Sequence, residues 1–347
     1  MQQEFKLECY KNCQKYLGLQ FCPDFKNFEI SPLSGGLTNE IFIVSNGSEN
    51  GTENGSSKYI YRIFGTGKTN NINEENIALA VLSTQNLAPK FYGAFENGRI
   101  EQFIQGRTLK TCELSDGNHV VEIAEKISKI HKLEMPVEKD GRGFLARVMG
   151  QFEEILDQNM NQNDINNSLD KNSKKFKLIQ KFKNYKTFTL KEIVSKSTSP
   201  IGYCHNDLQE LNIMKTDHQL YFIDYEYAAY NFICFDLANH FCERIYNYQV
   251  AHDLNNKQGF EIFKDNYPSN EQKIAFLRAY YGSSASENSN LNIINDLVTE
   301  IDKFSLVSDI FWAGWCLVQP FSESFDLIKY CEARIDRFEE MRGVYLA

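Results

Sequence analysis

The stretch CHNDLQELNIMKTDHQLYFIDYEY, residues 204–227, carries the most specific pattern in this chain. Its polar side chains His205, Asp207 and Asn212 follow an apolar run and fall on a predicted loop. An apolar strand then returns the chain to Asp224, twelve residues after Asn212. Because a carboxylate and an amide at this spacing are what phosphoryl transfer from a nucleotide requires, the pattern predicts a phosphotransferase architecture.

Each of these side chains has a chemical use in such a reaction. Asp207 can orient an acceptor hydroxyl and take its proton. Asn212 and Asp224 offer the hard oxygen ligands that Mg²⁺ prefers. A polar surface turn is the ordinary explanation for a single residue of this kind. Four polar residues at fixed offsets, bounded by apolar runs, favour an ATP-dependent phosphotransferase instead.

Length and composition allow one large two-lobed domain or two domains. The chain has 347 residues, 42% hydrophobic content and 26 Phe, so a packed core is expected and global disorder is excluded. The formal charge of -9 argues against a general nucleic-acid-binding protein, which would need a basic face.

The first residues, MQQEFKLECYKNC, lack the apolar core of a signal peptide, and no run is long enough to span a bilayer. The nine cysteines are scattered without zinc spacing, which predicts small buried residues or free thiols. We therefore expect a cytoplasmic protein with no integral membrane segment.

The first hundred residues predict a small lobe of antiparallel strands. A helix is expected over residues 1–27, and the apolar runs 28–30, 41–44, 59–64, 87–95 and 99–104 read as strands. Residues 73–84 predict one helix between them, and the polar tract 46–58 predicts an exposed hairpin loop.

Everything after Gly106 is predicted to be dominated by helices, apart from the hairpin at residues 201–224. An Asn-rich tract over 157–173 predicts an insert between helices. The following stretch, 171–186, is rich in lysine with interleaved apolar residues. We interpret it as a solvated helix face, with an anionic membrane surface as the alternative.

The small lobe contains residues suited to a nucleotide. Gly35 and Gly36 sit in the first hairpin turn, where a backbone without side chains can approach phosphates closely. On the third strand Arg62 can neutralise phosphate charge, and Glu75 on the next helix can hold that arginine in place. The chain then passes between the lobes near Gln102, where an extended backbone can hydrogen-bond an adenine.

A second cluster lies near the C-terminus, where both tryptophans of the chain occur in IFWAGWCLVQ. Trp312 and Trp315 are three residues apart and share one helix face. Indole faces attract cations that carry no N–H donors, so a quaternary ammonium suits them. Aromatic pairs at helical spacing also occur as ordinary core, and composition alone favours that alternative.

Taken together, HNDLQELN, IDYEYAAYN and FDLANHFCE resemble the catalytic segment of the choline/ethanolamine kinase family. The resemblance extends to SGGLTN, YRIFG, APKFYGAF, GRIEQFI, FWAGWCLVQ and KYCEAR, and so covers most of residues 28–340. It implies an α+β, two-lobed fold like that of protein kinases. We place a small antiparallel N-lobe at residues 1–104 and a larger, mainly helical C-lobe at 105–347.

The resemblance also implies roles for individual residues. The catalytic residues are Asp207 as base, with His205 and Gln209 in the same loop. The magnesium ligands are Asn212 and Asp224. The ATP-contacting residues are Gly35, Gly36, Leu37, Thr38, Asn39, Arg62, Glu75, Gln102, Phe103 and Ile104. The residues around the cationic head of the substrate are Glu243, Tyr248, Trp312, Trp315 and Tyr330. Asp236 resembles a structural Asp that bonds back to the catalytic loop.

One departure from the family pattern falls inside the catalytic loop. The family usually has Gly directly before the loop Asn, and this chain has Leu211. If that position needs a positive φ, the leucine strains the loop.

The reaction implied is ATP plus choline giving phosphocholine plus ADP with Mg²⁺, the first step of the CDP-choline route to phosphatidylcholine. Ethanolamine kinase, or dual activity, is the near alternative, because missing methyl groups discriminate by only about 1–3 kcal/mol each. A catalytically silent pseudokinase is the more remote one. The implied partners are small molecules, with no nucleic acid, and family members are often homodimers.

Overall fold

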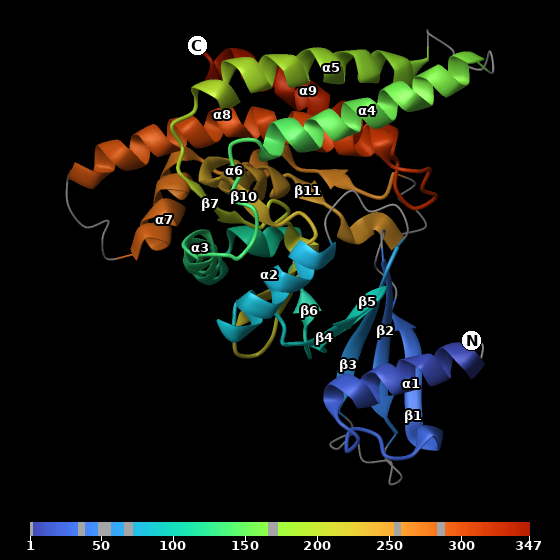
Figure 1. The fold of residues 1–347 in the computed structure, drawn as a ribbon. Coiled ribbons are helices and arrows are strands. Elements are labelled where there is room, and N and C mark those ends of the chain that lie inside the picture. The colour runs from blue at the N-terminus through green and yellow to red at the C-terminus, as the bar shows by residue number, and fades with distance from the viewer. Residues whose placement is uncertain are drawn as a thin grey trace. The chain divides into compact units, whose positions relative to one another are not determined.

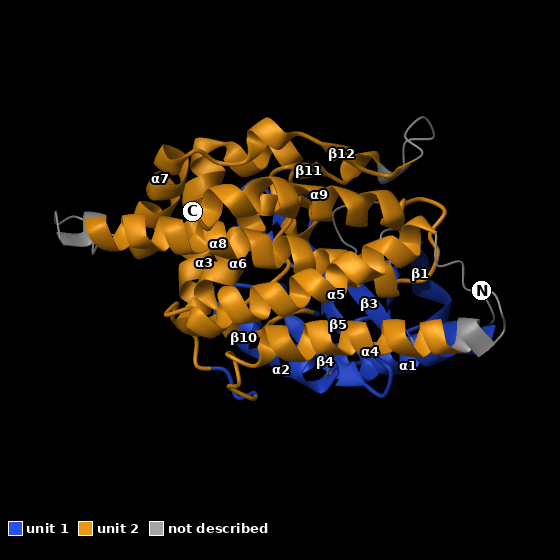
Figure 2. Cartoon of the chain, turned by 90° about the horizontal axis from the view of Figure 1, so that it is seen from above, with its two compact units in different colours: residues 1–107, 135–137, 214–226 blue, residues 108–134, 138–213, 227–347 orange. Residues whose placement is uncertain are grey.

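The computed structural model describes residues 3–33, 39–47, 57–65, 72–165, 173–252, 258–282 and 289–347. Two compact units divide the chain, and Figure 2 colours them separately. The N-terminal unit comprises residues 1–107, 135–137 and 214–226. The C-terminal unit comprises residues 108–134, 138–213 and 227–347.

The N-terminal unit is built on an antiparallel sheet of five strands in the order β1-β2-β3-β5-β4 (Figure 1). The strands of this sheet are β1 Phe28–Leu33, β2 Asn39–Asn46, β3 Lys58–Phe64, β4 Phe91–Phe95 and β5 Gly98–Gln102. The unit also contains β9 Leu220–Phe222, which is not part of this sheet. Its helices are α1 Gln3–Leu17 and α2 Ile72–Thr84, with the 3₁₀ turn η1 Phe25–Asn27. Two short strands, β6 Arg107–Thr108 and β8 Ile213–Lys215, fall at the boundaries of the two residue sets. The predicted small antiparallel lobe is confirmed.

The core of this unit forms where α1 packs on one face of the sheet. Cys9 and Cys13 of α1 are fully buried against Phe28, Tyr61 and Ile100. Because successive side chains of a strand point to opposite faces, burying Tyr61 here turns Arg62 to the other face. Arg62 therefore lies on the face of the sheet opposite the one that Tyr61 buries against α1.

Helix α1 is shorter than the sequence predicted. The helix ends at Leu17, and Gly18 follows with a φ of +88°. A residue in this left-handed region stops a helix, and glycine enters it without a Cβ clash. The expectation of a helix up to residue 27 was therefore wrong beyond this point.

The C-terminal unit is mainly helical. Its helices are α3 Gly117–His131, α4 Phe144–Ile165, α5 Lys174–Glu192, α6 Ile233–Glu243, α7 Asn270–Tyr281, α8 Ser289–Val318 and α9 Leu327–Tyr345. Its strands are β7 Ile201–Cys204, β10 Ala229–Phe232, β11 Tyr246–Asn247 and β12 Glu261–Ile262. Its 3₁₀ turns are η2 Thr111–Ser115, η3 Val194–Lys196, η4 Glu210–Asn212, η5 Gln249–His252 and η6 Lys264–Asn266. Strands β7 and β10 pair antiparallel.

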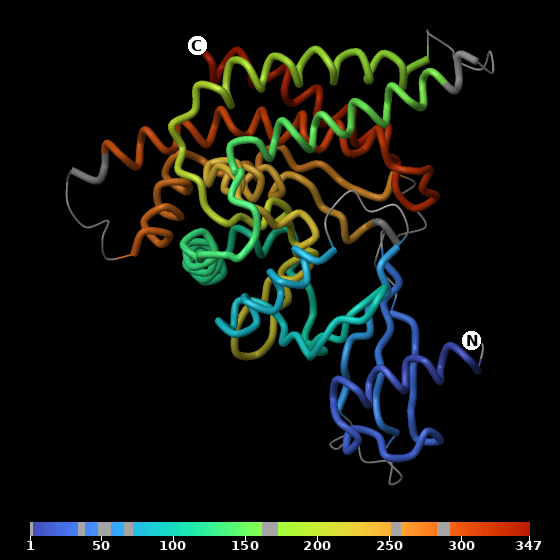
Figure 3. Tube along the Cα trace, viewed as in Figure 1, coloured from blue at the N-terminus to red at the C-terminus, as the bar shows by residue number. Residues whose placement is uncertain are grey.

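Helix α8 forms the centre of this unit and packs against α4, α5, α6 and α9 (Figure 3). Phe311, in its C-terminal half, contacts the rings of Phe144, Phe152 and Phe235 at centroid distances of 6.4, 5.5 and 5.5 Å. The C-terminal half of α8, residues 304–318, is mostly apolar and buried, as expected for a helix segment that packs on several sides. The core therefore fixes α6 and α8 side by side.

The lysine-rich stretch lies on α5, and its charges meet acidic residues of neighbouring helices. Lys183 and Lys186 pair with Asp157 and Glu153 of α4. On the α9 side, Lys181 pairs with a glutamate at 2.8 Å. These contacts place three lysines of the stretch in ion pairs between neighbouring helices.

Helix α4 runs through most of the Asn-rich tract, since it extends to Ile165. No Pro or Gly occurs between residues 157 and 165 to stop it. The expectation of an insert from residue 157 was wrong for 157–165, and residues 166–172 lie outside the described chain.

All nine cysteines are free and eight of them are buried, as predicted. Among the described residues, no helix combines the length and apolarity needed to cross a membrane.

Candidate active site

The loop that follows β7 holds Asp207 in a defined orientation. The side-chain amide of Asn212 donates to the Asp207 carboxylate Oδ2 at 2.9 Å and to the Asp207 carbonyl at 2.7 Å. His205 is buried, and its Nδ1 accepts from the Asp207 amide at 3.3 Å. These bonds fix the carboxylate before any substrate arrives.

Asp236, on α6, anchors this loop through hydrogen bonds to its backbone. Its carboxylate accepts from the backbone amides of His205 at 3.0 Å and Asn206 at 2.7 Å. Burial alone would raise the pKa of Asp236, but the hydrogen bond from His131 brings that pKa below its usual value. The bonds from Asp236 back to the loop are those that the family resemblance implied.

Backbone strain marks the same loop. Asn206 has a φ of +65°, and its side chain is held by bonds to Tyr227 and Asn231 at 2.9 and 2.8 Å. Asparagine tolerates this left-handed conformation better than other residues with a Cβ. Such conformations persist only where the surroundings hold them, and they gather at functional sites.

Leu211 does not strain the loop. It lies in η4, and it is not among the described non-glycine residues with positive φ, which are Asn86, Asn206 and Asp224. The amide of Leu211 donates to Gln209 Oε1 at 2.7 Å, so Gln209 caps the turn. Position 211 therefore does not have a positive φ, and the strain expected of leucine in that case is absent.

The N-terminal unit carries a buried network of four charges. Arg62 Nε and Arg99 Nε both donate to Glu101 Oε1, at 2.8 and 2.7 Å, and Arg99 Nη1 reaches Glu75 at 2.7 Å. Burial would raise the pKa of Glu101, but the two guanidiniums lower it to about 2. The sequence predicted Arg62 and Glu75, and it missed Arg99 and Glu101, which link them.

Asp224 sits at the end of the hairpin with a φ of +62°. Its Oδ1 is buried without a hydrogen bond and lies 3.6 Å from Arg62 Nη1. An aspartate oxygen in this state fits a cation better than it fits a structural bond. In Asn212 the amide nitrogen is engaged by Asp207, which leaves the amide oxygen as the acceptor. Each of these two oxygens, taken within its own unit, is therefore of the kind that fits magnesium.

The other residues predicted to contact ATP divide into two groups. Gly35, Gly36, Leu37 and Thr38 lie outside the described residues. Asn39 begins β2 and is buried, with its Oδ1 lacking a hydrogen-bond partner.

The segment Gln102–Ile104 leaves the sheet at the end of β5. Gln102 is tied to Lys90 by a backbone bond of 2.8 Å and a side-chain bond of 3.1 Å. Beyond it, Phe103 is half-buried and Ile104 is buried. Of the three residues, Gln102 alone is part of a strand, and the contact of this segment with adenine stays a prediction.

Three of the five residues predicted around the substrate's cationic head form one cluster in the C-terminal unit. Tyr248 donates its hydroxyl to Glu243 Oε2 at 2.6 Å and also contacts the Tyr330 hydroxyl. The rings of Tyr248 and Tyr330 lie 5.9 Å apart. Phe260 and Phe325 pack on Tyr330 at 5.2 and 5.3 Å.

The two tryptophans of α8 are three residues apart, about one helix turn, and their rings are in contact. Their rings are 5.7 Å apart in an edge arrangement. Trp312 donates its indole N–H to Asn239 of α6 at 2.7 Å, whereas the Trp315 indole N–H is buried without a partner. Trp315 is partly exposed, and Tyr227 packs on Trp312 at 5.4 Å.

Glu210 ties the catalytic loop to the tyrosine cluster, a link that the sequence did not reveal. Its Oε1 accepts from the Tyr248 amide at 2.8 Å and from Thr111 Oγ1 at 3.2 Å. Burial raises the pKa of Glu210 to about 8. In the sequence, the only indication of a role for Glu210 was its position between Asp207 and Asn212.

A cluster of three buried side chains near the catalytic loop has the residue types of a metal site but is already bonded internally. His131, Cys204 and Asp236 bring ligand-type atoms within 4.8 Å of one another. His131 there already bonds Asp236 and Tyr280, at 2.9 and 2.8 Å. Burial raises the pKa of the Cys204 thiol well above its usual value, so these three residues form a structural cluster.

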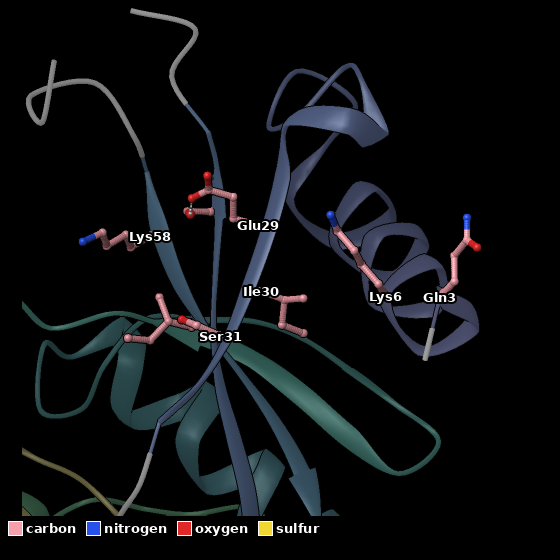
Figure 4. Close-up of a pocket in the computed structure, with 8 residues that line it drawn as sticks. Gln3, Lys6, Glu29, Ile30, Ser31 and Lys58 are labelled. Carbon is pink, nitrogen blue, oxygen red and sulfur yellow. Dashed lines mark hydrogen bonds between the residues drawn. The ribbon is translucent and has the colours of Figure 1, made fainter. Parts of the chain in front are cut away.

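An open cavity of about 730 Å³ lies at the edge strand β1 (Figure 4). Its lining includes Lys6, Lys58 and Glu29, and Figure 4 shows them around β1. None of the residues predicted for the site lines it.

Nearly the whole chain is similar in fold and in sequence to known kinases of small alcohols. A solved choline kinase from Cryptosporidium parvum has a TM-score of 0.77 and 25% identity, covering 96% of this chain and 94% of that one. Choline/ethanolamine kinase of Rattus norvegicus is 28% identical over 358 residues, covering 96% of this chain and 86% of the rat protein. Probable ethanolamine kinase A of Dictyostelium discoideum is 30% identical, covering 94% and 90%.

The fold is that of the protein-kinase-like phosphotransferases. Residues 30–340 match the family model of choline/ethanolamine kinase. The chain therefore belongs to the choline/ethanolamine kinase family, and it is a kinase with an alcohol acceptor.

Proposed function

We propose that this protein is a choline kinase that transfers the γ-phosphoryl group of ATP to the choline hydroxyl. The observation that carries the choice of substrate is the aromatic cluster of Tyr248 and Tyr330, with the tryptophan pair on the adjoining helix α8. Aromatic faces attract a cation that has no hydrogens to donate. Trimethylammonium is such a cation.

Asp207 is proposed as the residue that receives the hydroxyl proton. Asn212 holds Asp207 Oδ2 at 2.9 Å, so the carboxylate keeps one orientation while the hydroxyl docks. A positioned carboxylate contributes typically about 10²–10⁴-fold to such a step.

ATP supplies the phosphoryl group, and Mg²⁺, when bound, would offset the negative charge of the phosphates. Asn212 and Asp224 would provide oxygen ligands to the metal. Arg62, fixed by Glu101 at 2.8 Å, would neutralise phosphate charge. Segment 102–104 would receive the adenine along its backbone.

Ethanolamine is the second candidate substrate, since a probable ethanolamine kinase lies among the relatives. Its primary ammonium carries N–H donors and wants hydrogen-bond acceptors. The cluster offers mainly rings, which favours choline over ethanolamine.

The first experiment is ADP release from magnesium-ATP with choline and with ethanolamine, offered separately. We expect turnover with choline at the larger kcat/KM. Asp207→Asn should lower kcat about 10²–10⁴-fold and leave ATP binding in place.

Asp217→Asn is the matched control, because Asp217 is an exposed aspartate of the same hairpin. It should turn over like the wild type. Turnover with neither substrate, despite ATP binding, would contradict the proposal.

A further inference from the structure

Glu243 already has a cationic partner inside the protein. Arg334 Nη2 of α9 contacts Glu243 Oε1, and Tyr248 donates to Oε2 at 2.6 Å. Arg334 Nε donates to the Tyr330 hydroxyl at 2.9 Å, and Tyr330 in turn contacts the Tyr248 hydroxyl. These four side chains therefore close a ring of hydrogen bonds that engages both carboxylate oxygens.

Two further charges complete this arrangement. Asp309 of α8 accepts from Arg334 Nη1 at 3.5 Å and from Arg337 Nη1 at 2.5 Å. Two acids, Glu243 and Asp309, thus face two arginines, and we call these four residues the charge quartet. The exposed fractions are 2% for Glu243, 0% for Asp309 and Arg334, and 6% for Arg337. These charges are therefore compensated by one another and not by water.

Arg334 is held firmly as a cation. Burial alone would lower its pKa, but the Glu243 carboxylate raises it well above the ordinary value. Its guanidinium also stacks on Tyr246, 4.1 Å from the ring centroid, and lies 5.0 Å from the Tyr330 ring. The positive charge thus lies against the rings of Tyr246 and Tyr330.

This pairing changes what the cluster offers to a ligand. A quaternary ammonium needs no acceptor, since ring faces alone attract it. A primary ammonium gives up hydrogen bonds to water and needs acceptors in return. Glu243 would be the natural acceptor, yet its charge is compensated by Arg334 and each of its oxygens already accepts one hydrogen bond.

We propose that Arg334 is a specificity-determining residue, which occupies Glu243 and thereby favours a quaternary ammonium over a primary one. It acts through Glu243 and the two tyrosine hydroxyls, so it is a positioning residue. This inference rests on the proposed function and names the chemical class that its substrate site takes.

The test is kcat/KM for choline and for its analogues with two, one and no N-methyl groups. In the wild type we expect kcat/KM to rise with each methyl group. Arg334→Met frees Glu243 Oε1 and removes the compensating charge, so it should lower the kcat/KM ratio of choline to ethanolamine about tenfold, chiefly through KM for ethanolamine. Arg334→Lys keeps a charge beside Glu243, so its ratio of choline to ethanolamine should lie between those of the wild type and Arg334→Met.

Arg337→Met is the matched control. Arg337 lies three residues along the same helix, is buried, and contacts Asp309. It should lose a similar amount of stability and keep the wild-type ratio. Should Arg334→Met fail to fold, Tyr248→Phe decides, because it removes only the hydroxyl that holds Glu243 Oε2. That variant should shift the ratio in the same direction.

The outcomes separate this inference from the proposed function. Absence of turnover with every analogue would contradict the proposed function. Turnover in the wild type with an unchanged ratio in Tyr248→Phe and in every folded Arg334 variant would overturn the role of Arg334 alone. A wild type that prefers ethanolamine, or a ratio that falls equally in Arg337→Met, would also overturn it.

Discussion

Leu211 shows how a single residue can depart from a family pattern without cost. Its φ is ordinary, and its amide is capped by Gln209 at 2.7 Å. Left-handed backbone in this loop lies instead at Asn206. The position before Asn212 therefore does not need glycine.

We expect Leu211→Gly to destabilise the protein by about 1 kcal/mol and to leave kcat/KM within about twofold. Glycine gains no conformational benefit where φ is negative, and it adds entropy to the unfolded chain. Urea unfolding and ADP release would measure the two effects. Higher stability or higher activity in the variant would show that leucine does strain the loop.

The charge network around Arg62 shows what sequence reasoning at the residue scale missed. The sequence identified Arg62 and Glu75, but the register of β3 and β5 sets Arg62 opposite Arg99. Like charges directly opposite repel, and Glu101 resolves this by accepting from both. Register depends on the pairing of two distant strands, so these partners could not be read from either strand alone.

At the scale of elements, helix α8 approaches its neighbours through Gly314. A Cβ at this position would lie 2.4 Å from the Phe182 ring of α5 and 3.0 Å from the Phe152 ring of α4. Both rings are buried in the core. Glycine therefore permits the close contact of three helices, despite its poor helix propensity.

Gly314→Ala is expected to destabilise the protein by about 1–3 kcal/mol, because the added methyl overpacks the core. Gly150→Ala, in α4, is the opposite case, since a Cβ there meets nothing within 4 Å. It should stabilise the protein by about 0.5–1 kcal/mol. Thermal unfolding of the two variants checks the pair, and a change of the same sign in both would refute this explanation.

Elements were predicted well where apolar periodicity is strong. The strands of the N-terminal sheet and helix α2 lie within a few residues of the predicted ranges. The errors fall at ends, at Gly18 and within 157–165, because a boundary depends on one residue's conformation rather than on a repeating pattern.

At the scale of the whole molecule, a buried histidine links global stability to pH. His240 donates Nδ1–H to the Leu208 carbonyl at 3.0 Å, and its Nε2 is buried without a partner. Burial, with Arg244 and His205 nearby, lowers the pKa of His240 to about 3, although Asp236 opposes this.

The sign of the effect follows from where protons bind. Below the ordinary histidine pKa of about 6.5, the unfolded chain takes up a proton that folded His240 refuses until about pH 3. Relative to His240→Asn, the wild type should therefore lose about 1.4 kcal/mol of unfolding free energy between pH 7.5 and 5.5.

Urea unfolding at pH 7.5, 6.5 and 5.5 would measure this difference, and comparison with the variant cancels the other titrating groups. His218→Asn, at an exposed histidine, is the control and should follow the wild type. A His240→Asn curve parallel to the wild type would contradict the expectation.

The sequence by itself determined the reaction class, because Asp207, Asn212 and Asp224 lie within one short stretch whose spacing survives folding. It also determined the two-part α+β layout, since apolar periodicity is local. The tertiary structure alone decided the partners of those residues. Arg334 meets Glu243, 91 residues away, only because α9, α8 and α6 pack together. Contacts between distant segments leave no spacing in the chain, so only the packed core reveals them.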